Sequence, residues 1–142
     1  MSAYEADIFA WSEHQAELLR RRARGELVNE AEIDWPNVAE EIESVGRSEL
    51  RACRSLLKQA LSHMLKAEAW PLSRDAPTWR ADAIDFRQQA REAFTPSMRD
   101  HIDVEDLYRQ AVRAMPETID GQPPLPVPPE CIVALDELLS EP

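Results

Sequence analysis

The 142-residue sequence has few glycines, few cysteines and no long apolar run. Its three glycines stand against 19 alanines, which favours helices because alanine costs least in a helix and glycine is among the most costly residues. The two cysteines are 78 positions apart and fit neither a disulfide framework nor a zinc cluster. No stretch of about 18 apolar residues is present, and the first residues lack the pattern of a secretory signal. These absences predict a reduced, cytoplasmic protein without a membrane span.

Acidic residues are abundant. The sequence contains 27 Asp and Glu against 16 Lys and Arg, for a formal charge of −11. This negative net charge argues against a nucleic acid or an anionic membrane as the main partner. Residues 1–99 hold 17 acids and 14 bases, whereas residues 100–142 hold ten acids and two bases. The acidity therefore lies in the last third, where a basic partner is one hypothesis.

The spacing of apolar residues predicts five helices, over residues 4–24, 34–67, 75–94, 103–115 and 130–139. Asp34 is a good N-cap for the second helix, and Pro36 fits its first turn. Six of the eleven prolines fall in residues 116–129, which predicts an extended segment that packs along the helices. We expect one all-α domain over residues 1–142: a compact bundle of three to four main helices with a long second helix, a proline-rich arm and a short C-terminal helix.

The long second helix carries the most informative pattern. One stripe, drawn at 100° per residue, contains Val38, Ile42, Val45, Ala52, Leu56 and Ala60. Glu49 and His63 fall on the same stripe and need partners there, because burial of an unpaired charge is costly. Cys53 lies beside them and is interpreted as a small core residue.

Several segments together resemble the domain of unknown function 29 family of bacterial helical proteins. They are YEADIFAWSEHQAELL from Tyr4, IDWPNVAEEIESVGRSE from Ile33, LLKQALSHMLK from Leu56, TWRADAIDFR from Thr78 and TPSMR from Thr95. The resemblance covers nearly the whole chain and implies an all-helical single domain without an assigned role. Phe86 stands where the family often has His or Gln, which weakens any metal site that would include His63.

Two interpretations of the charged residues remain open. Glu41, Glu49, Arg80 and Arg87 are expected to form an ion network between the second and third helices. The second interpretation is a binding pocket. Either Arg80 and Arg87 bind a small anion, or Glu41, His63, Arg80 and Asp85 surround a polar pocket for another small ligand. No Glu-x-x-His spacing typical of metal sites in helical bundles is present, and nucleophile and phosphate-loop motifs are absent. We therefore predict neither a metal nor a cofactor.

The sequence favours a small non-enzymatic module that binds a protein partner or a second copy of itself. The reason is the second helix, whose apolar stripe is longer than a small bundle is expected to cover. The alternative is a small-molecule or metal-binding enzyme with a pocket around His63 between the second and third helices.

Overall fold

In the computed structural model, which describes residues 1–141, the chain folds into helices joined by turns and extended segments. The α-helices are α1 (Ala3–Ala6), α2 (Ile8–Ala23), α3 (Trp35–Ala69), α4 (Ala76–Ala93), α5 (Val104–Arg113) and α6 (Leu135–Leu139). Two 3₁₀ helices cover Glu30–Glu32 and Pro96–His101. No residue from 1 to 141 belongs to a strand, apart from an isolated bridge between Ile119 and Gln122. The predicted all-α class is confirmed.

The contacts within the chain gather in two compact units, and α3 contributes residues to both. The N-terminal unit is Met1–Arg47, and the C-terminal unit runs from Ser48 onward. The single domain expected for residues 1–142 stays a prediction.

The N-terminal unit has a small core that polar side chains hold together. Trp11, Leu18 and Ile33 are its buried apolar residues, and the buried Gln15 accompanies them. The Gln15 amide donates to the carbonyl oxygen of Glu32 at 3.0 Å and accepts from the backbone N–H of Asp34 at 2.8 Å. This side chain therefore joins α2 to the segment that leads into α3, and it meets the requirement that buried polar groups have partners.

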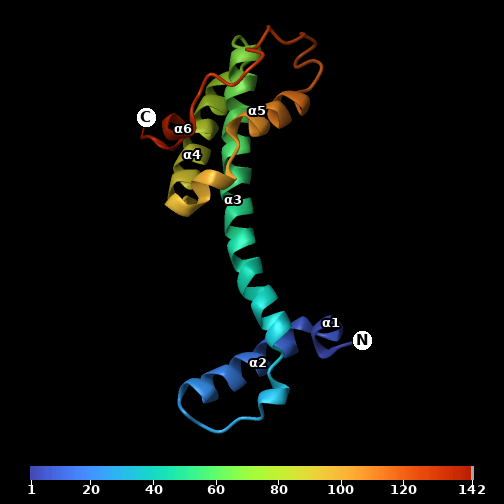
Figure 1. Cartoon of the computed structure of the whole chain (residues 1–142). Coiled ribbons are helices and arrows are strands. Elements are labelled where there is room, and N and C mark those ends of the chain that lie inside the picture. The colour runs from blue at the N-terminus through green and yellow to red at the C-terminus, as the bar shows by residue number, and fades with distance from the viewer. Residues whose placement is uncertain (142) are drawn as a thin grey trace. The chain divides into compact units, whose positions relative to one another are not determined.

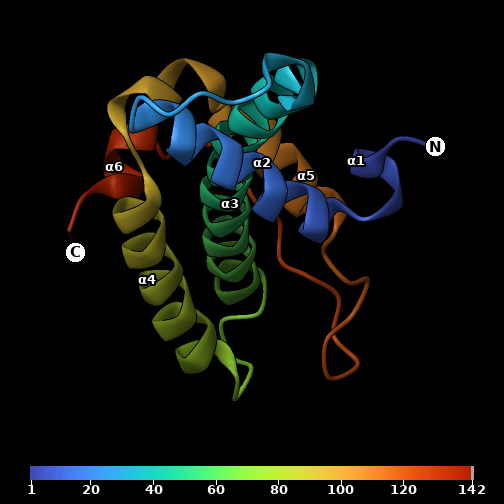
Figure 2. The same ribbon diagram turned by 90° about the horizontal axis from the view of Figure 1, so that it is seen from below.

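The core of the C-terminal unit lies where α3, α4 and α5 meet. Both views of the ribbon place the second half of α3 between α4 and α5 (Figures 1 and 2). The buried cluster combines residues from these three helices with one residue of α6 and with Ile102, which directly follows the second 3₁₀ helix. Its members are Cys53, Leu57, Leu61, Leu65, Ala90, Ile102, Leu107, Tyr108, Ala111 and Leu138.

The predicted stripe on the second helix matches the fully buried face only at Ala60, and the rest of the prediction is wrong in its register. The buried residues of α3 are Cys53, Leu57, Ala60, Leu61, Leu65, Ala67 and Ala69. Ile42 and Val45 are 69% and 65% exposed, and Glu49 is exposed instead of needing a buried partner. Because α3 is covered from two sides by α4 and α5, the buried arc is centred on Leu57, Leu61 and Leu65. A one-dimensional stripe does not contain this information.

Two predicted helix limits also differ from the structure. The first helix is interrupted at Asp7, whose carboxylate accepts from the backbone N–H of Ala10 at 3.0 Å and so caps α2. The last helix begins at Leu135 and not at Glu130. The backbone N–H of Cys131 donates to Glu105 at 3.0 Å, so this residue bonds to α5 and does not start a helical turn.

The proline-rich segment is anchored at the end of α3 and along α5. The backbone N–H of Leu125 donates to the carbonyl oxygen of Ala69 at 2.9 Å, and the Trp70 indole donates to that of Gln122 at 2.9 Å. A tight turn at Asp120 and Gly121, both with positive φ, reverses the chain just before these contacts, between the bridged residues Ile119 and Gln122. The anchored segment then leads into the residues that form one wall of the site.

Candidate functional site

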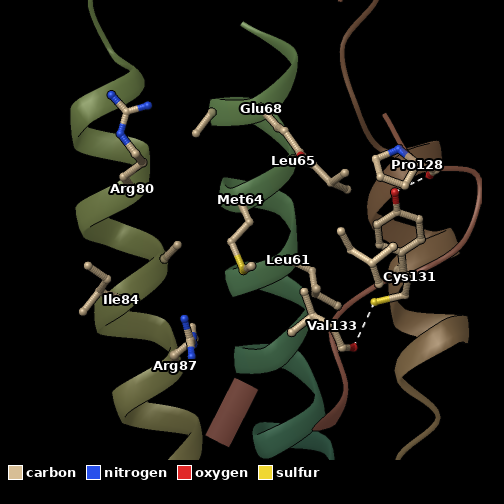
Figure 3. Close-up of a pocket in the computed structure, with 14 residues that line it drawn as sticks. Leu61, Met64, Leu65, Glu68, Arg80, Ile84, Arg87, Pro128, Cys131 and Val133 are labelled. Carbon is tan, nitrogen blue, oxygen red and sulfur yellow. Dashed lines mark hydrogen bonds between the residues drawn. The ribbon is translucent and has the colours of Figure 1, made fainter. Parts of the chain in front are cut away.

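An apolar pocket of about 600 Å³ lies in the C-terminal unit (Figure 3). α3 and α4 form two of its walls, with Leu61 and Met64 on the first and Ile84 on the second. The chain that follows the proline-rich segment forms the opposite wall with residues that include Cys131 and Val133. This volume falls within the range of about 300–1,000 Å³ that is typical of small-molecule pockets, which are also mostly apolar.

Arg87 lines the pocket and fastens α6 to α4. Its Nε donates to the carbonyl oxygen of Leu138 at 3.1 Å, and its Nη2 donates to that of Glu137 at 2.6 Å. Cations near the carboxyl end of a helix satisfy carbonyl groups that have no partner within the helix. Both acceptors are neutral, so the positive charge of Arg87 is not compensated by a carboxylate.

Arg80 and Glu68 bring two further charges to the rim of the pocket. Both side chains are exposed, and in the described part of the chain neither forms a hydrogen bond or an ion pair. Figure 3 shows Arg80 extending from α4 and Glu68 lying on α3 at the same end of the pocket. These two groups are therefore free to bind a ligand.

Tyr108 and Cys131 supply the remaining polar atoms of the lining. The Tyr108 hydroxyl donates to the carbonyl oxygen of Pro128, which ties α5 to the opposite wall. The Cys131 thiol donates to the carbonyl oxygen of Val133 at 3.3 Å, as drawn in Figure 3. Both side chains thus hold the wall in place.

Burial keeps these two groups protonated. It raises the pKa of the Tyr108 hydroxyl above its ordinary value of 10.0, and the negative charge of Glu68 adds to the effect. Burial also raises the pKa of the Cys131 thiol above 9.0, although the bond to Val133 acts in the opposite direction. A protonated thiol is a weak nucleophile, so the pocket lacks an activated cysteine.

Of the predicted site residues, Arg80 and Arg87 are brought together in this pocket, whereas His63 and Asp85 lie outside its lining. His63 Nδ1 donates to the carbonyl oxygen of Gln59 at 2.8 Å, and its Nε2 lies 3.8 Å from an Asp82 carboxylate oxygen. Asp85 accepts a hydrogen bond from Gln89 on the next turn of α4 at 2.8 Å.

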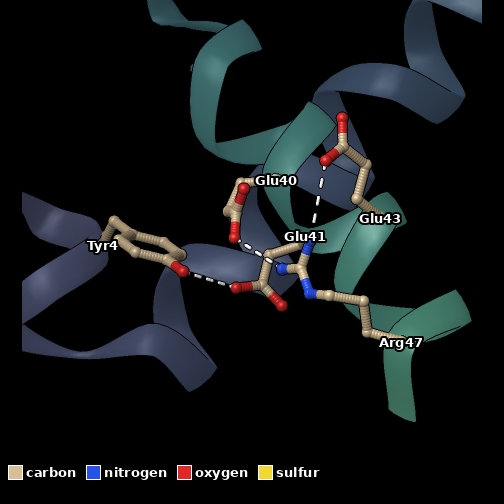
Figure 4. Close-up of polar contacts among 5 residues, drawn as sticks. All are labelled: Tyr4, Glu40, Glu41, Glu43 and Arg47. Atoms are coloured by element: carbon tan, nitrogen blue, oxygen red, sulfur yellow. Dashed lines mark hydrogen bonds and ion pairs between the residues drawn. The ribbon is translucent and has the colours of Figure 1, made fainter.

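Glu41 belongs to the N-terminal unit, where it accepts a hydrogen bond from the Tyr4 hydroxyl at 2.5 Å (Figure 4). This bond raises the pKa of Tyr4 above 10.0. The neighbouring Arg47 pairs with Glu40 at 2.6 Å and with Glu43 at 3.6 Å. Glu49 makes no hydrogen bond or ion pair with any residue from 1 to 141. Glu40, Glu41 and Glu43 thus take partners within the N-terminal unit. Among residues 1–141 neither Glu41 nor Glu49 pairs with Arg80 or Arg87, so the predicted ion network is wrong.

The pocket wall after the proline-rich segment could not be found from the sequence. Cys131 and Val133 lie in extended chain, where no helical period signals which side chains face inward. Tyr108 lies on a predicted helix and Glu68 directly follows the predicted end of another, but nothing in the spacing marks either as a pocket residue. Across residues 1–141, no group of three His, Cys, Asp or Glu side chains could hold a metal ion. None of the described helices has the length and apolar character needed to cross a bilayer.

The fold and the pocket define a small all-helical protein with a site of ligand size. The family described as domain of unknown function DUF29 matches residues 3–142, and the chain belongs to this family. A similar solved structure is that of an alpha-helical protein of unknown function from Rhodospirillum rubrum, with 32% identity and a TM-score of 0.69. The match covers 99% of this chain and 91% of that chain. No curated protein matches.

Proposed function

We propose that the C-terminal unit is a binding module for a small organic molecule that occupies the pocket between α3, α4 and the wall around Cys131. The observation that carries the proposal is the apolar volume of about 600 Å³ with a guanidinium at its rim, that of Arg80, which has no partner among residues 1–141. Apolar cavities with a few polar groups that fix orientation are the usual form of ligand sites. The site differs from the pocket predicted around His63, which lies elsewhere on α3.

The groups in the pocket favour binding over catalysis. An enzyme needs a nucleophile or a general acid or base with a pKa near the working pH. The pKa values of Tyr108 and Cys131 are both raised, and each group already donates to a backbone carbonyl oxygen. A reducing compartment such as the cytoplasm suits this role, because Cys131 contributes a free thiol to the lining.

The experiment measures binding of the neutral apolar dye Nile red to the full chain. We expect saturable binding that Ile84→Trp weakens by about tenfold, because the larger side chain fills part of the pocket. Leu72→Trp is the matched control, since Leu72 is 98% exposed and lies outside the pocket lining. Thermal unfolding of both variants shows that they are folded. Equal affinity of the two variants, or no saturable binding, contradicts the proposal.

A second role, self-association through the N-terminal unit, is favoured by a different observation. Among its large apolar residues this unit buries only Trp11, Leu18 and Ile33. It exposes Ile8, Phe9, Leu27, Trp35, Ile42 and Val45 by half or more of their surface. A unit of this size rarely has enough core to be stable alone, and large exposed apolar surfaces mark interaction sites.

We propose a second copy of the chain as the occupant of this surface. Val38, Ile42 and Val45 recur at helical spacing, and a face of this kind can pair with an identical face about a twofold axis. Sedimentation of the full chain tests the proposal. A dimer supports it, and a strict monomer at every concentration contradicts it.

A further inference from the structure

We infer that the ligand of the pocket is a monoanionic organic acid, a carboxylate on an apolar chain or ring, with its carboxylate bound by Arg80. The inference rests on the proposed binding function and adds the chemical class of the ligand. It starts from the charges that line the pocket, because the apolar walls alone do not select between a neutral molecule and an anion.

The charged groups of the lining are two guanidinium groups and one carboxylate. Arg80 and Arg87 lie seven residues apart on α4, which corresponds to about 10 Å along the helix. Within residues 1–141, Glu68 is the only acid that lines the pocket, and it is exposed. The pocket thus has a positive balance in a chain whose formal charge is −11. A site with the opposite sign to the rest of the molecule favours an anionic ligand.

The two arginines are not equivalent. Arg87 already donates through Nε and Nη2 to the carbonyl oxygens of Leu138 and Glu137, so its position is fixed by α6. Arg80 has no such partner within residues 1–141, and its donors are unoccupied. A free guanidinium presents a planar pair of N–H groups that matches a carboxylate in a bidentate arrangement. Arg80 is therefore the anchor, and Arg87 adds charge from a fixed place.

The neighbouring acid limits the charge of the ligand. Glu68 lies at the same end of the pocket as Arg80 (Figure 3), so a dianion such as a phosphate monoester would meet repulsion there. A single negative charge balances the lining more closely. The remaining volume is bounded by Leu61, Met64 and Ile84, which favour an apolar body.

The test compares three ligands of equal chain length with the full protein: sodium decanoate, 1-decanol and decylamine. Their affinities are measured by displacement of Nile red and by protection of Cys131 from N-ethylmaleimide. Cys53 is an internal control for the labelling, because it is fully buried. We expect decanoate to bind about tenfold more tightly than decanol, and decylamine to bind more weakly than either.

Arg80→Gln is expected to abolish the preference for decanoate, because it removes the cationic donors that distinguish a carboxylate from a hydroxyl group. Arg74→Gln, an exposed arginine that is not part of the lining, is the matched control and should keep the preference. If decanol binds as tightly as decanoate to the unmodified chain, the inference is overturned and the proposed binding function stands. If Arg80→Gln keeps the preference, Arg80 is not the anchor and the inference is also overturned. If Nile red binds saturably but none of the three ligands displaces it or protects Cys131, the inference is overturned and the proposed binding function stands. If Nile red itself does not bind saturably, both proposals fail.

Discussion

At the scale of single residues, the Asp34 side chain holds two helices of the N-terminal unit together through hydrogen bonds. Its carboxylate accepts from the Trp11 indole and from the Asn37 side chain, each at 2.9 Å. The bond from Asn37 is the largest cause of a pKa below the ordinary value of 3.8, and the bond from Trp11 adds to it, although burial opposes both. The ionised carboxylate thus joins α2 to the first turn of α3.

The lowered pKa of Asp34 predicts how stability depends on pH. A group whose pKa is lower in the folded than in the unfolded chain stabilises the fold above the unfolded value, here 3.8, and this contribution disappears as the pH falls through the folded value. We expect Asp34→Asn to lower the urea midpoint at pH 7, and the difference from the unmodified chain to shrink toward pH 3.

The matched control is Asp75→Asn, because Asp75 precedes α4 without a side-chain capping bond. This variant should show no comparable loss at pH 7. If Asp34→Asn lowers the urea midpoint by the same amount at pH 3 as at pH 7, the ionised carboxylate does not have this role.

At the scale of elements, the side of α3 that packs in the core differs from the side that the apolar stripe in the sequence predicts. The stripe predicts Leu56 as the core position, whereas the structure buries Leu57 completely and Leu56 only in part. We expect Leu57→Ala to lower the free energy of unfolding by about 2–5 kcal/mol, because it removes buried methyl groups and leaves a cavity. Leu56→Ala makes the same change of helix propensity one residue earlier and should cause a smaller loss. Urea unfolding measures the loss of stability in both variants. A larger loss for Leu56→Ala than for Leu57→Ala would support the predicted stripe over the packed face described above.

The elements also show how far the sequence predicts the fold. Alanine content, the caps at Asp34 and Asp103 and the proline at the start of α4 locate the main helices, because these are local signals. The break at Asp7 is missed because the apolar spacing continues through it. The late start of α6 is missed because Cys131 bonds to Glu105, which is 26 residues away in the sequence. Long-range partners of this kind are not encoded in a local pattern.

The same distinction applies to the site. Arg80 and Arg87 are candidates because two cations on the predicted third helix can pair with carboxylates or bind a small anion. The donors of Arg87 are taken by the carbonyl oxygens of α6, a helix about 50 residues later, and the sequence does not show this pairing. His63 was a candidate on a predicted apolar face, but the face is rotated, and its Nδ1 bonds within α3.

At the scale of the whole molecule, self-association opposes the net charge. Two copies with a formal charge of −11 each repel one another, so the apolar contacts of the proposed face must offset this repulsion. We expect Ile42→Asp to give a monomer in sedimentation experiments, because Ile42 is 69% exposed on the proposed face. Leu72→Asp, on an exposed turn of the C-terminal unit, should leave the dimer unchanged.

The dimer of the unmodified chain should also strengthen as salt rises, since salt screens the repulsion between the two copies. A dimer that survives Ile42→Asp, or that dissociates when salt is added, contradicts an apolar interface at this face.

The wall around Cys131 has a consequence for how the pocket loosens. This stretch contains neither helix nor strand, and the prolines at 126, 128 and 129 have no N–H to donate. Its bonds to α5 come from the Tyr108 hydroxyl and the Glu105 carboxylate. Loss of these two side-chain hydrogen bonds detaches the stretch from α5 while every helix stays intact. The wall is therefore the part of the lining that loosens at the least cost, far below that of unfolding the unit.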